Sequence, residues 1–274
     1  MVRLIAALVG IVFCAALLWG AVLPRDATAP DQVKALHLHP REVDFTFNNP
    51  VVGTFDRQQL QRGMQVYKEV CSACHSLNRV AFRNLTDLGF NAAEVKALAK
   101  GYDVPSIDDK TGEVNTRKAL PSDHFPPPFP NDTAARAANN NALPPDLSLI
   151  TKAREDGSQY VHSLLAGYKD APKGWTVPDG LYYNPYFRSL NIAMPPPLTE
   201  GQVTYADGTK ASVEQMAEDV SAFLTWTAEP KLEARRRTGT GAVLFLIILT
   251  VLAYASYQRV WRDVKGKKTA TPAV

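Results

Sequence analysis

The chain has 274 residues, of which 46% are hydrophobic and 21% charged, and its formal net charge at pH 7 is +3. This length allows one domain of ordinary size with additional segments. Three cysteines are too few for a zinc site made of two cysteine pairs, and the chain has no internal repeat and no glycine-rich nucleotide-binding loop. We expect no nucleic-acid partner.

An apolar, uncharged segment follows Arg3 and occupies residues 4–23. It is longer than the apolar region of about 7–15 residues that a signal peptide usually has. Residues 27–29 (A-T-A) resemble a cleavage site, but Pro30 directly follows them. Residues 1–24 are therefore either a signal peptide or an N-terminal membrane helix, and either one would carry the next segment across the membrane.

The first helix predicted after this segment begins at Asp56, which forms a capping-box pattern with Gln59. Its apolar face carries Leu60, Met64, Tyr67 and Cys71. The helix therefore leads directly into the pentapeptide C-S-A-C-H of residues 71–75.

Two cysteines separated by two residues and followed directly by a histidine are the attachment motif of c-type haem. Residues three apart lie on one face of a helical turn, so the thiols of Cys71 and Cys74 can bond the two vinyl groups of one porphyrin. His75 is then the expected fifth ligand of the iron. The motif predicts one covalent haem c, a redox role and a compartment outside the cytoplasm.

A zinc site and a thioredoxin-like redox pair are the alternatives for C-x-x-C. Zinc needs four ligands, and the third cysteine, Cys14, lies in the apolar N-terminal segment. A thioredoxin-like site needs a βαβ context, which the sequence lacks.

Three further helices are predicted from their capping residues. They begin at Asn91, Gln159 and Ser212 and end near Gly101, Ala166 and Pro230, with capping boxes formed by Asn91 with Glu94 and by Ser212 with Gln215. Residues 202–205 and 209–212 predict a small hairpin. The chain also has 20 prolines, which stiffen the loops. We therefore predict a mainly α-helical domain with long ordered loops over residues 30–232.

The sixth ligand of the iron would be a thioether or an imidazole. The candidates are Met1, Met64, Met194, Met216, His37, His39, His124 and His162. Three prolines follow Met194 and hold its loop rigid, which suits a ligand that must stay at bonding distance. We predict Met194, with His124 as the alternative, and expect Met216 and His162 to be structural. Two strong ligands favour electron transfer over substrate chemistry at the iron.

A second apolar segment, residues 239–257, nearly spans a hydrocarbon core of about 30 Å at about 1.5 Å per residue. Three arginines precede it and five basic residues follow it. We predict a transmembrane anchor at 238–258 and a basic cytoplasmic tail at 259–274. Because the basic residues are nearly balanced, the haem motif decides the orientation and places the preceding domain outside the cytoplasm.

The domain before the anchor is acidic. Residues 30–231 contain 24 acidic and 20 basic residues. This excess would attract a basic soluble partner, although a merely soluble surface is the alternative reading.

Further short motifs occur in order along the chain. They are R-G at residues 62–63, V-Y at 66–67, A-A-R-A-A-N-N at 134–140, A-L-P-P-D-L-S at 142–148, Y-Y-N-P-Y-F at 182–187, the Met194 loop, D-V at 219–220, F-L at 223–224 and A-E-P at 228–230. Over about residues 45–262 the chain resembles the cytochrome c1 family, the haem subunit of the cytochrome bc1 complex.

The resemblance implies a large class I cytochrome c-like domain held by one C-terminal transmembrane helix, with haem bonded to Cys71 and Cys74 and ligated by His75 and Met194. Arg154 matches an arginine that neutralises a haem propionate, and its alternative is a plain surface residue. The other matching pocket positions are Tyr160, Pro144, Asn139 and Phe187. Some bacterial members carry a disulfide near the methionine loop, which this chain cannot form because only Cys14 remains.

The resemblance also implies partners: cytochrome b, the Rieske iron–sulfur protein as electron donor, a soluble or membrane-tethered cytochrome c as acceptor, and membrane lipid. It implies a bacterial-type inner membrane with the haem domain in the periplasm. Quinol oxidation would belong to the assembled complex, since no substrate bond is broken at this chain. One alternative is a free-standing membrane-anchored cytochrome that shuttles electrons to a terminal oxidase. Another is a peroxidase-like haem enzyme, which requires a vacant or weakly held sixth position.

Overall fold

The computed structural model describes residues 2–22 and 32–266. It divides into two units, Met1–His37 and Leu38–Val274. The first unit contains helices α1 (Val2–Val22) and α2 (Gln32–Leu36).

Helix α1 coincides with the apolar N-terminal segment. Its apolar part, Ala6–Trp19, is shorter than a typical membrane span. The cleavage pattern at residues 27–29 lies outside the described residues, so both readings of this segment stay predictions.

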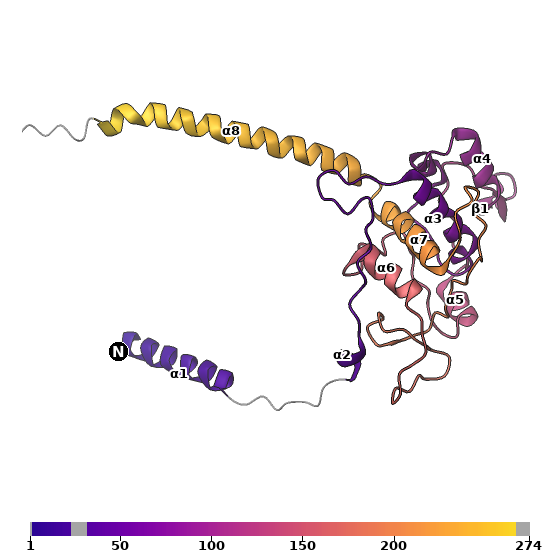
Figure 1. Ribbon diagram of the computed structural model, residues 1–274, viewed down its shortest axis with the longest axis horizontal. Coiled ribbons are helices and arrows are strands. Elements are labelled where there is room, and N and C mark those ends of the chain that lie inside the picture. The colour runs from indigo at the N-terminus through magenta and orange to yellow at the C-terminus, as the bar shows by residue number, and fades with distance from the viewer. Residues whose placement is uncertain (1, 23–31, 267–274) are drawn as a thin grey trace, which may run out of the picture. The chain divides into compact units, whose positions relative to one another are not determined.

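The second unit is mainly helical, as predicted (Figure 1). Its helices are α3 (Arg57–Glu69), α4 (Ala92–Lys100), α5 (Asp132–Ala138), α6 (Gly157–Ala166), α7 (Val213–Ala228) and α8 (Leu232–Gly266), with 3-10 helices η1 (Cys71–Ala73) and η2 (Phe82–Leu88). Two separate antiparallel hairpins pair β1 (Asp103–Ile107) with β2 (Val114–Lys118) and β3 (Tyr182–Tyr183) with β4 (Asn191–Ile192).

The helix starts predicted at Asp56, Asn91 and Ser212 are confirmed, whereas α6 begins at Gly157, two residues before the predicted Gln159. Asp56 accepts hydrogen bonds from the first-turn amides of α3, and Asn91 forms a complete capping box with Glu94 at α4. Ser212 Oγ accepts from Gln215 N at 3.2 Å, but Ser212 N donates to Lys210 O at 3.0 Å and not to the Gln215 side chain. At α3, likewise, Asp56 caps the first-turn amides without a return bond from its own N–H to the Gln59 side chain. The capping boxes predicted at α3 and α7 are therefore only half formed.

The hydrophobic core lies where α3 crosses α7 and α6 covers α7 (Figure 1). Its largest fully buried side chains include Trp226, Tyr67, Phe82, Phe125 and Phe223. Several of these rings touch: Tyr67 lies edge-on to Phe125, and Phe223 stacks on Trp226. Met216 is also buried in this core, which confirms its predicted structural role.

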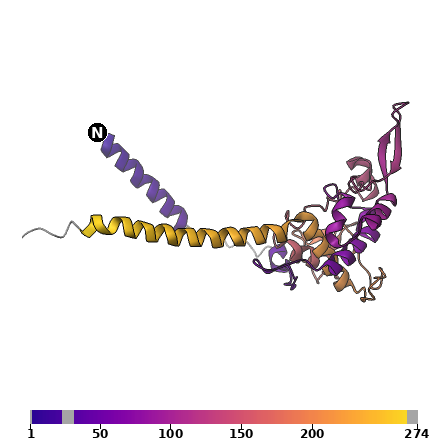
Figure 2. The same ribbon diagram turned by 90° about the horizontal axis from the view of Figure 1, so that it is seen from above.

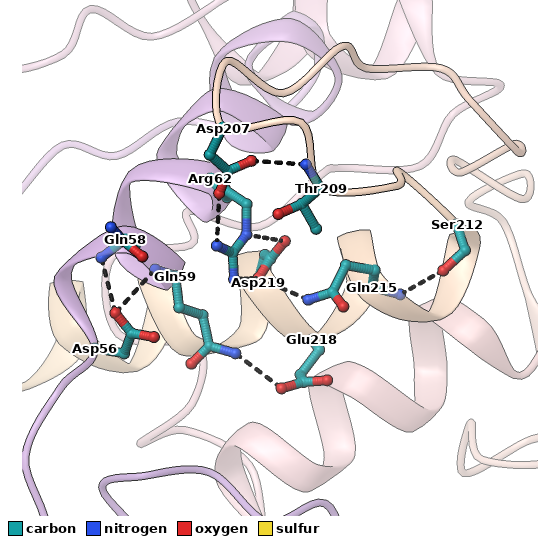
Figure 3. Close-up of polar contacts among 10 residues, drawn as sticks. All are labelled: Asp56, Gln58, Gln59, Arg62, Asp207, Thr209, Ser212, Gln215, Glu218 and Asp219. Carbon is teal, nitrogen blue, oxygen red and sulfur yellow. Dashed lines mark hydrogen bonds and ion pairs between the residues drawn. The ribbon is translucent and has the colours of Figure 1, made fainter.

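A charged network joins α3, α7 and the loop between β4 and α7 (Figure 3). Arg62 binds the Asp219 carboxylate through two hydrogen bonds of 3.0 Å and Asp207 through one of 2.9 Å. The Asp219 side chain is fully buried. Burial alone would lower the pKa of Arg62, but its bonds to the two carboxylates raise that pKa above its ordinary value, so the guanidinium stays charged.

The hairpin predicted around residues 207–208 is wrong. The segment forms a turn, with Gly208 N bonded to Tyr205 O, and it contains no strand. Val203 and Tyr205 are buried in the core, and Asp207 is bonded to Arg62, so side-chain packing fixes the segment in place of strand pairing. Neither of the two hairpins that do form was predicted from the sequence; one of them, β1–β2, stands out from the helices in Figure 2.

Helix α8 contains the predicted anchor. Glu229, Pro230 and Lys231 separate it from α7. Among the described residues it supplies the one helix long and apolar enough to cross a membrane, Leu232–Arg262, and the most apolar part of that span is not buried against the rest of the chain. These features are consistent with a membrane anchor. The end of the predicted tail, 267–274, lies outside the described residues.

Candidate functional site

The C-S-A-C-H motif lies in a tight turn directly after α3. Helix α3 ends at Glu69, and the amides of Cys74 and His75 both bond to Cys71 O, at 3.1 and 2.9 Å. Neither Cys71 nor Cys74 is in a disulfide. Burial raises the pKa of the Cys71 thiol to about 12, so it is protonated at neutral pH. The turn thus presents two free thiols and an imidazole within five residues.

The ring of His75 has a defined orientation. Its Nδ1 lies 2.8 Å from Pro145 O, and because a carbonyl oxygen only accepts, Nδ1 carries the proton. The lone pair on Nε2 is then free to ligate a metal, because the carbonyl fixes both the tautomer and the orientation of the ring. Burial lowers the pKa of His75. The hydrogen bond to Pro145 O and the negative charge of Asp146 oppose this fall but do not cancel it. The imidazole is therefore neutral at pH 7, as a ligand must be.

Asp146 fastens the Pro145 loop to the motif. Its carboxylate accepts hydrogen bonds of 2.8 Å from both Ser76 Oγ and Asn78 N, and one of 3.0 Å from Ser148 N. Burial would raise the pKa of Asp146, but these donated bonds outweigh it and lower the pKa. Tyr67 OH, from α3, adds a 3.0 Å bond to His75 O. The backbone at His75 and directly after it is thus held by the side chains of Tyr67 and Asp146.

Met194 follows β4 and is partly buried. Tyr168 OH donates a 2.9 Å hydrogen bond to Met194 O. Asn191 is the first residue of β4, and its side-chain Oδ1 accepts a 3.0 Å hydrogen bond from Trp175 Nε1. The methionine loop is therefore fixed at two points upstream of its prolines, by aromatic side chains from the segment after α6.

The remaining predicted pocket residues lie in four different segments. Arg154 is exposed; its Nη1 bonds to Ala153 O at 3.0 Å, and its charge lies close enough to Tyr160 to oppose the rise in pKa that burial causes there. Pro144, Asn139 and Phe187 are each partly buried. A side-chain hydrogen bond joins Arg154 and Tyr160, but the other three residues lie in separate segments, so the shared role of all five stays a prediction.

The donor set fits a covalently attached haem c better than a zinc ion. Within the described residues, no three His, Cys, Asp or Glu side chains gather as a metal site. Two free thiols, an oriented neutral imidazole and a partly buried thioether are the groups that haem c attachment and ligation require.

Comparison with known proteins decides the family. The model of the Cytochrome C1 family matches residues 45–264, which is most of the chain. The chain belongs to the cytochrome c1 family. This family consists of haem-carrying electron-transfer proteins, and the residues that suggested the resemblance lie within the matched range.

Relatives at 42–47% identity come from bacteria, fungi and plants. Cytochrome c1 of Rhodospirillum rubrum is 44% identical over 90% of this chain and 95% of its own length. Cytochrome b/c1 of Bradyrhizobium diazoefficiens is 47% identical over 77% of this chain, which spans about a third (34%) of that longer protein. The cytochrome b-c1 complex catalytic subunit, mitochondrial, of Candida albicans is 42% identical over 90% of this chain and 86% of its own length.

The residues that hold His75 and the Met194 loop in place were not predicted from the sequence. Pro145 acts through its backbone carbonyl, which no sequence pattern marks. The turn at Asp146 could have been predicted, because an aspartate side chain commonly accepts a hydrogen bond from the backbone N–H two residues later, here that of Ser148. Tyr168 and Trp175 had no such signal, since their partners lie 26 and 16 residues away in the chain.

Proposed function

We propose that the chain carries one haem c, bonded covalently through Cys71 and Cys74 and ligated by His75 and Met194. The observation that carries this proposal is the hydrogen bond from His75 Nδ1 to Pro145 O, which leaves Nε2 available to iron. The free thiols directly before His75 support the same assignment. Family membership supports it independently.

When bound, haem supplies a one-electron redox centre whose potential depends on its axial ligands. The chain holds His75 neutral and oriented, so the imidazole binds without losing a proton. It holds Met194 by the backbone, so the thioether is presented in a fixed loop. If His75 and Met194 both ligate the iron, they would leave no position for a substrate, which favours electron transfer over a peroxidase-like reaction.

We assign the remaining pocket roles by the family resemblance. Arg154 would neutralise a haem propionate through a charge-assisted hydrogen bond. Tyr160, Pro144, Asn139 and Phe187 would line the pocket and exclude water from it. Residues 30–232 would form the class I cytochrome c domain.

We propose that the chain takes one electron from the Rieske iron–sulfur protein and passes it to a soluble or membrane-tethered cytochrome c. The name of the Candida relative supports a complex that includes cytochrome b. Residues 238–258 would anchor the chain in a bacterial-type inner membrane with the haem domain in the periplasm and the tail, 259–274, in the cytoplasm. The acidic excess of residues 30–231 would favour a basic acceptor.

A reduced-minus-oxidised visible spectrum of the tagged chain, purified in mild detergent, tests this proposal. We expect b-type bands to accompany the c-type band, because cytochrome b would co-purify. A c-type band alone, under conditions that preserve other membrane complexes, would favour the free-standing shuttle. Replacing Cys71 and Cys74 by serine should remove the covalent haem seen on a denaturing gel, and covalent haem that persists would contradict the attachment site.

The sixth ligand has its own test. Met194→His replaces a thioether by a second imidazole and should lower the midpoint potential, since methionine favours reduced iron. His124→Ala tests the alternative ligand and should leave the potential unchanged. Met216→Leu controls for changing a methionine in the buried core. If His124→Ala changes the midpoint potential and Met194→His does not, His124 and not Met194 is the sixth ligand.

A further inference from the structure

A short loop before α3 presents two exposed valines. In this loop, residues 49–53, Asn49 Oδ1 accepts hydrogen bonds from Val51 N at 2.9 Å and Val52 N at 3.1 Å, and Gly53 N bonds to Asn49 O at 3.1 Å. These bonds make a closed turn. Val51 is 56% exposed and Val52 is 72% exposed. The turn therefore holds two apolar side chains outward at its tip.

The loop is fastened to the beginning of α8. Arg236 Nη1 donates to Phe47 O at 2.7 Å and to Gly53 O at 3.2 Å, so one guanidinium holds the chain on both sides of the tip. A Cβ on Gly53 would lie 2.5 Å from Asn49 O and 2.9 Å from Phe47 C, both backbone atoms, which is why a glycine stands there. Glu233, one turn earlier in α8, accepts from Phe55 N at 2.8 Å. The position of the loop along α8 is therefore fixed.

That position coincides with the edge of the membrane span. No charged residue occurs from 238 to 258, which corresponds to about 30 Å of helix, the thickness of a hydrocarbon core. Arg236 and Arg237 come just before this run, at the level of the lipid headgroups. In Figure 1 the chain entering α3 lies on the side of the domain from which α8 leaves. Residues 48–54 carry no charge that would oppose contact with lipid.

We propose that Val51 and Val52 enter the lipid interface beside α8 and form a second membrane contact of the domain. The occupant of this surface is lipid because the tip is apolar and uncharged and is bonded to α8 about two turns before Val243, where the exposed apolar surface of the helix begins. Arg236 positions the loop; it binds two protein carbonyls and thereby sets the depth of the valines. The contact depends on α8 as a membrane span and not on the electron-transfer partners.

Spin labelling of the full chain tests the contact. In a Cys14→Ser background, Val52→Cys is labelled and the chain is reconstituted in phosphatidylcholine vesicles. Accessibility to oxygen, which concentrates in lipid, is compared with accessibility to a water-soluble nickel chelate. Val114→Cys on β2 is the matched control, since Val114 is an equally apolar and 85% exposed residue. The visible haem spectrum verifies that each variant is folded.

We expect the oxygen-to-nickel ratio at residue 52 to exceed that at residue 114 several-fold. Adding Arg236→Gln should lower the oxygen-to-nickel ratio at residue 52 toward that of the control, because the loop loses its two hydrogen bonds to α8. Equal ratios at residues 52 and 114 would overturn the proposal. A label at residue 52 that is immobilised and shielded from both reagents would also overturn it, since that result indicates a protein partner.

Discussion

Gly63 on α3 lies directly against the backbone of Asp219 on α7. A Cβ built on Gly63 would lie 2.0 Å from Asp219 O and 2.7 Å from Phe223 Cβ, closer than real Cβ atoms approach. The two helices therefore cross at a distance that only glycine permits. This crossing fixes the helix that ends at the C-S-A-C-H motif against the helix that leads to α8.

Gly63→Ala should destabilise the domain by about 3 kcal/mol or more, because the added methyl group has to separate α3 from α7. Guanidinium unfolding of the detergent-solubilised chain, followed by circular dichroism, measures the loss. Gly239→Ala is the matched control: its Cβ meets nothing within 4 Å. Similar losses in the two variants would contradict the steric explanation.

Arg62→Met should cost about 3–5 kcal/mol, because it leaves the fully buried Asp219 carboxylate without its cation. The apparent Tm of the chain measures this effect. The double variant with Asp219→Leu removes the buried charge as well and should recover much of the loss. If the double variant is no more stable than the single one, packing of the Arg62 side chain and not its charge is what matters.

Tyr168→Phe should loosen the methionine loop without changing the ligand set. It removes the 2.9 Å bond to Met194 O, a contribution of about 1 kcal/mol. We expect a lower midpoint potential and a weaker red absorption band of methionine-ligated ferric haem. Tyr182→Phe, at an exposed tyrosine, controls for loss of a hydroxyl. An unchanged band in Tyr168→Phe would show that the prolines alone hold Met194.

His162 should make the stability of the chain depend on pH. Its ring is 1% exposed and lies 3.2 Å from Glu214, which also binds Arg41. Burial lowers the pKa of His162. The negative charge of Glu214 opposes this fall, and the positive charge of Arg41 adds to it. The folded state therefore binds this proton less readily than the unfolded state, so stability should fall as the pH drops through about 6.5.

Apparent Tm values at about pH 7.5 and pH 5.5 bracket this transition. His162→Phe should reduce the difference between the two temperatures, because the group that titrates is gone. Glu214→Gln keeps His162 but removes the carboxylate that faces it. The difference in Tm between the two pH values should then be at least as large as in the unaltered chain. A His162→Phe chain that retains the full difference would assign the pH dependence to other groups.

Local signals in the sequence predicted the helices well and the loops poorly. Asn91 with Glu94 marks the start of α4 because a capping box involves residues only three apart. The hairpin expected near residue 207 failed because Arg62, 145 residues away, binds Asp207. Strands β1 and β2 escaped notice because β2 is exposed along its whole length and shows no apolar alternation.

The candidate site divides in the same way. The covalent motif can be read from five consecutive residues, whereas the orientation of His75 depends on Pro145, 70 residues further along the chain. Met194 can be predicted as the sixth ligand by elimination, because the sequence contains few thioethers and imidazoles. The hydroxyl that holds its backbone belongs to Tyr168, and only the folded chain brings the two together.

The fastening of α8 has a mechanical consequence. Glu233 and Arg236 bond its first two turns to the loop before α3, and α3 is locked through Gly63 to α7. The predicted anchor is thus joined to the domain by side-chain bonds as well as by the chain itself, which fixes the orientation of the C-S-A-C-H motif relative to α8. If the chain relays an electron as proposed, its donor and its acceptor would therefore each have to move to the domain.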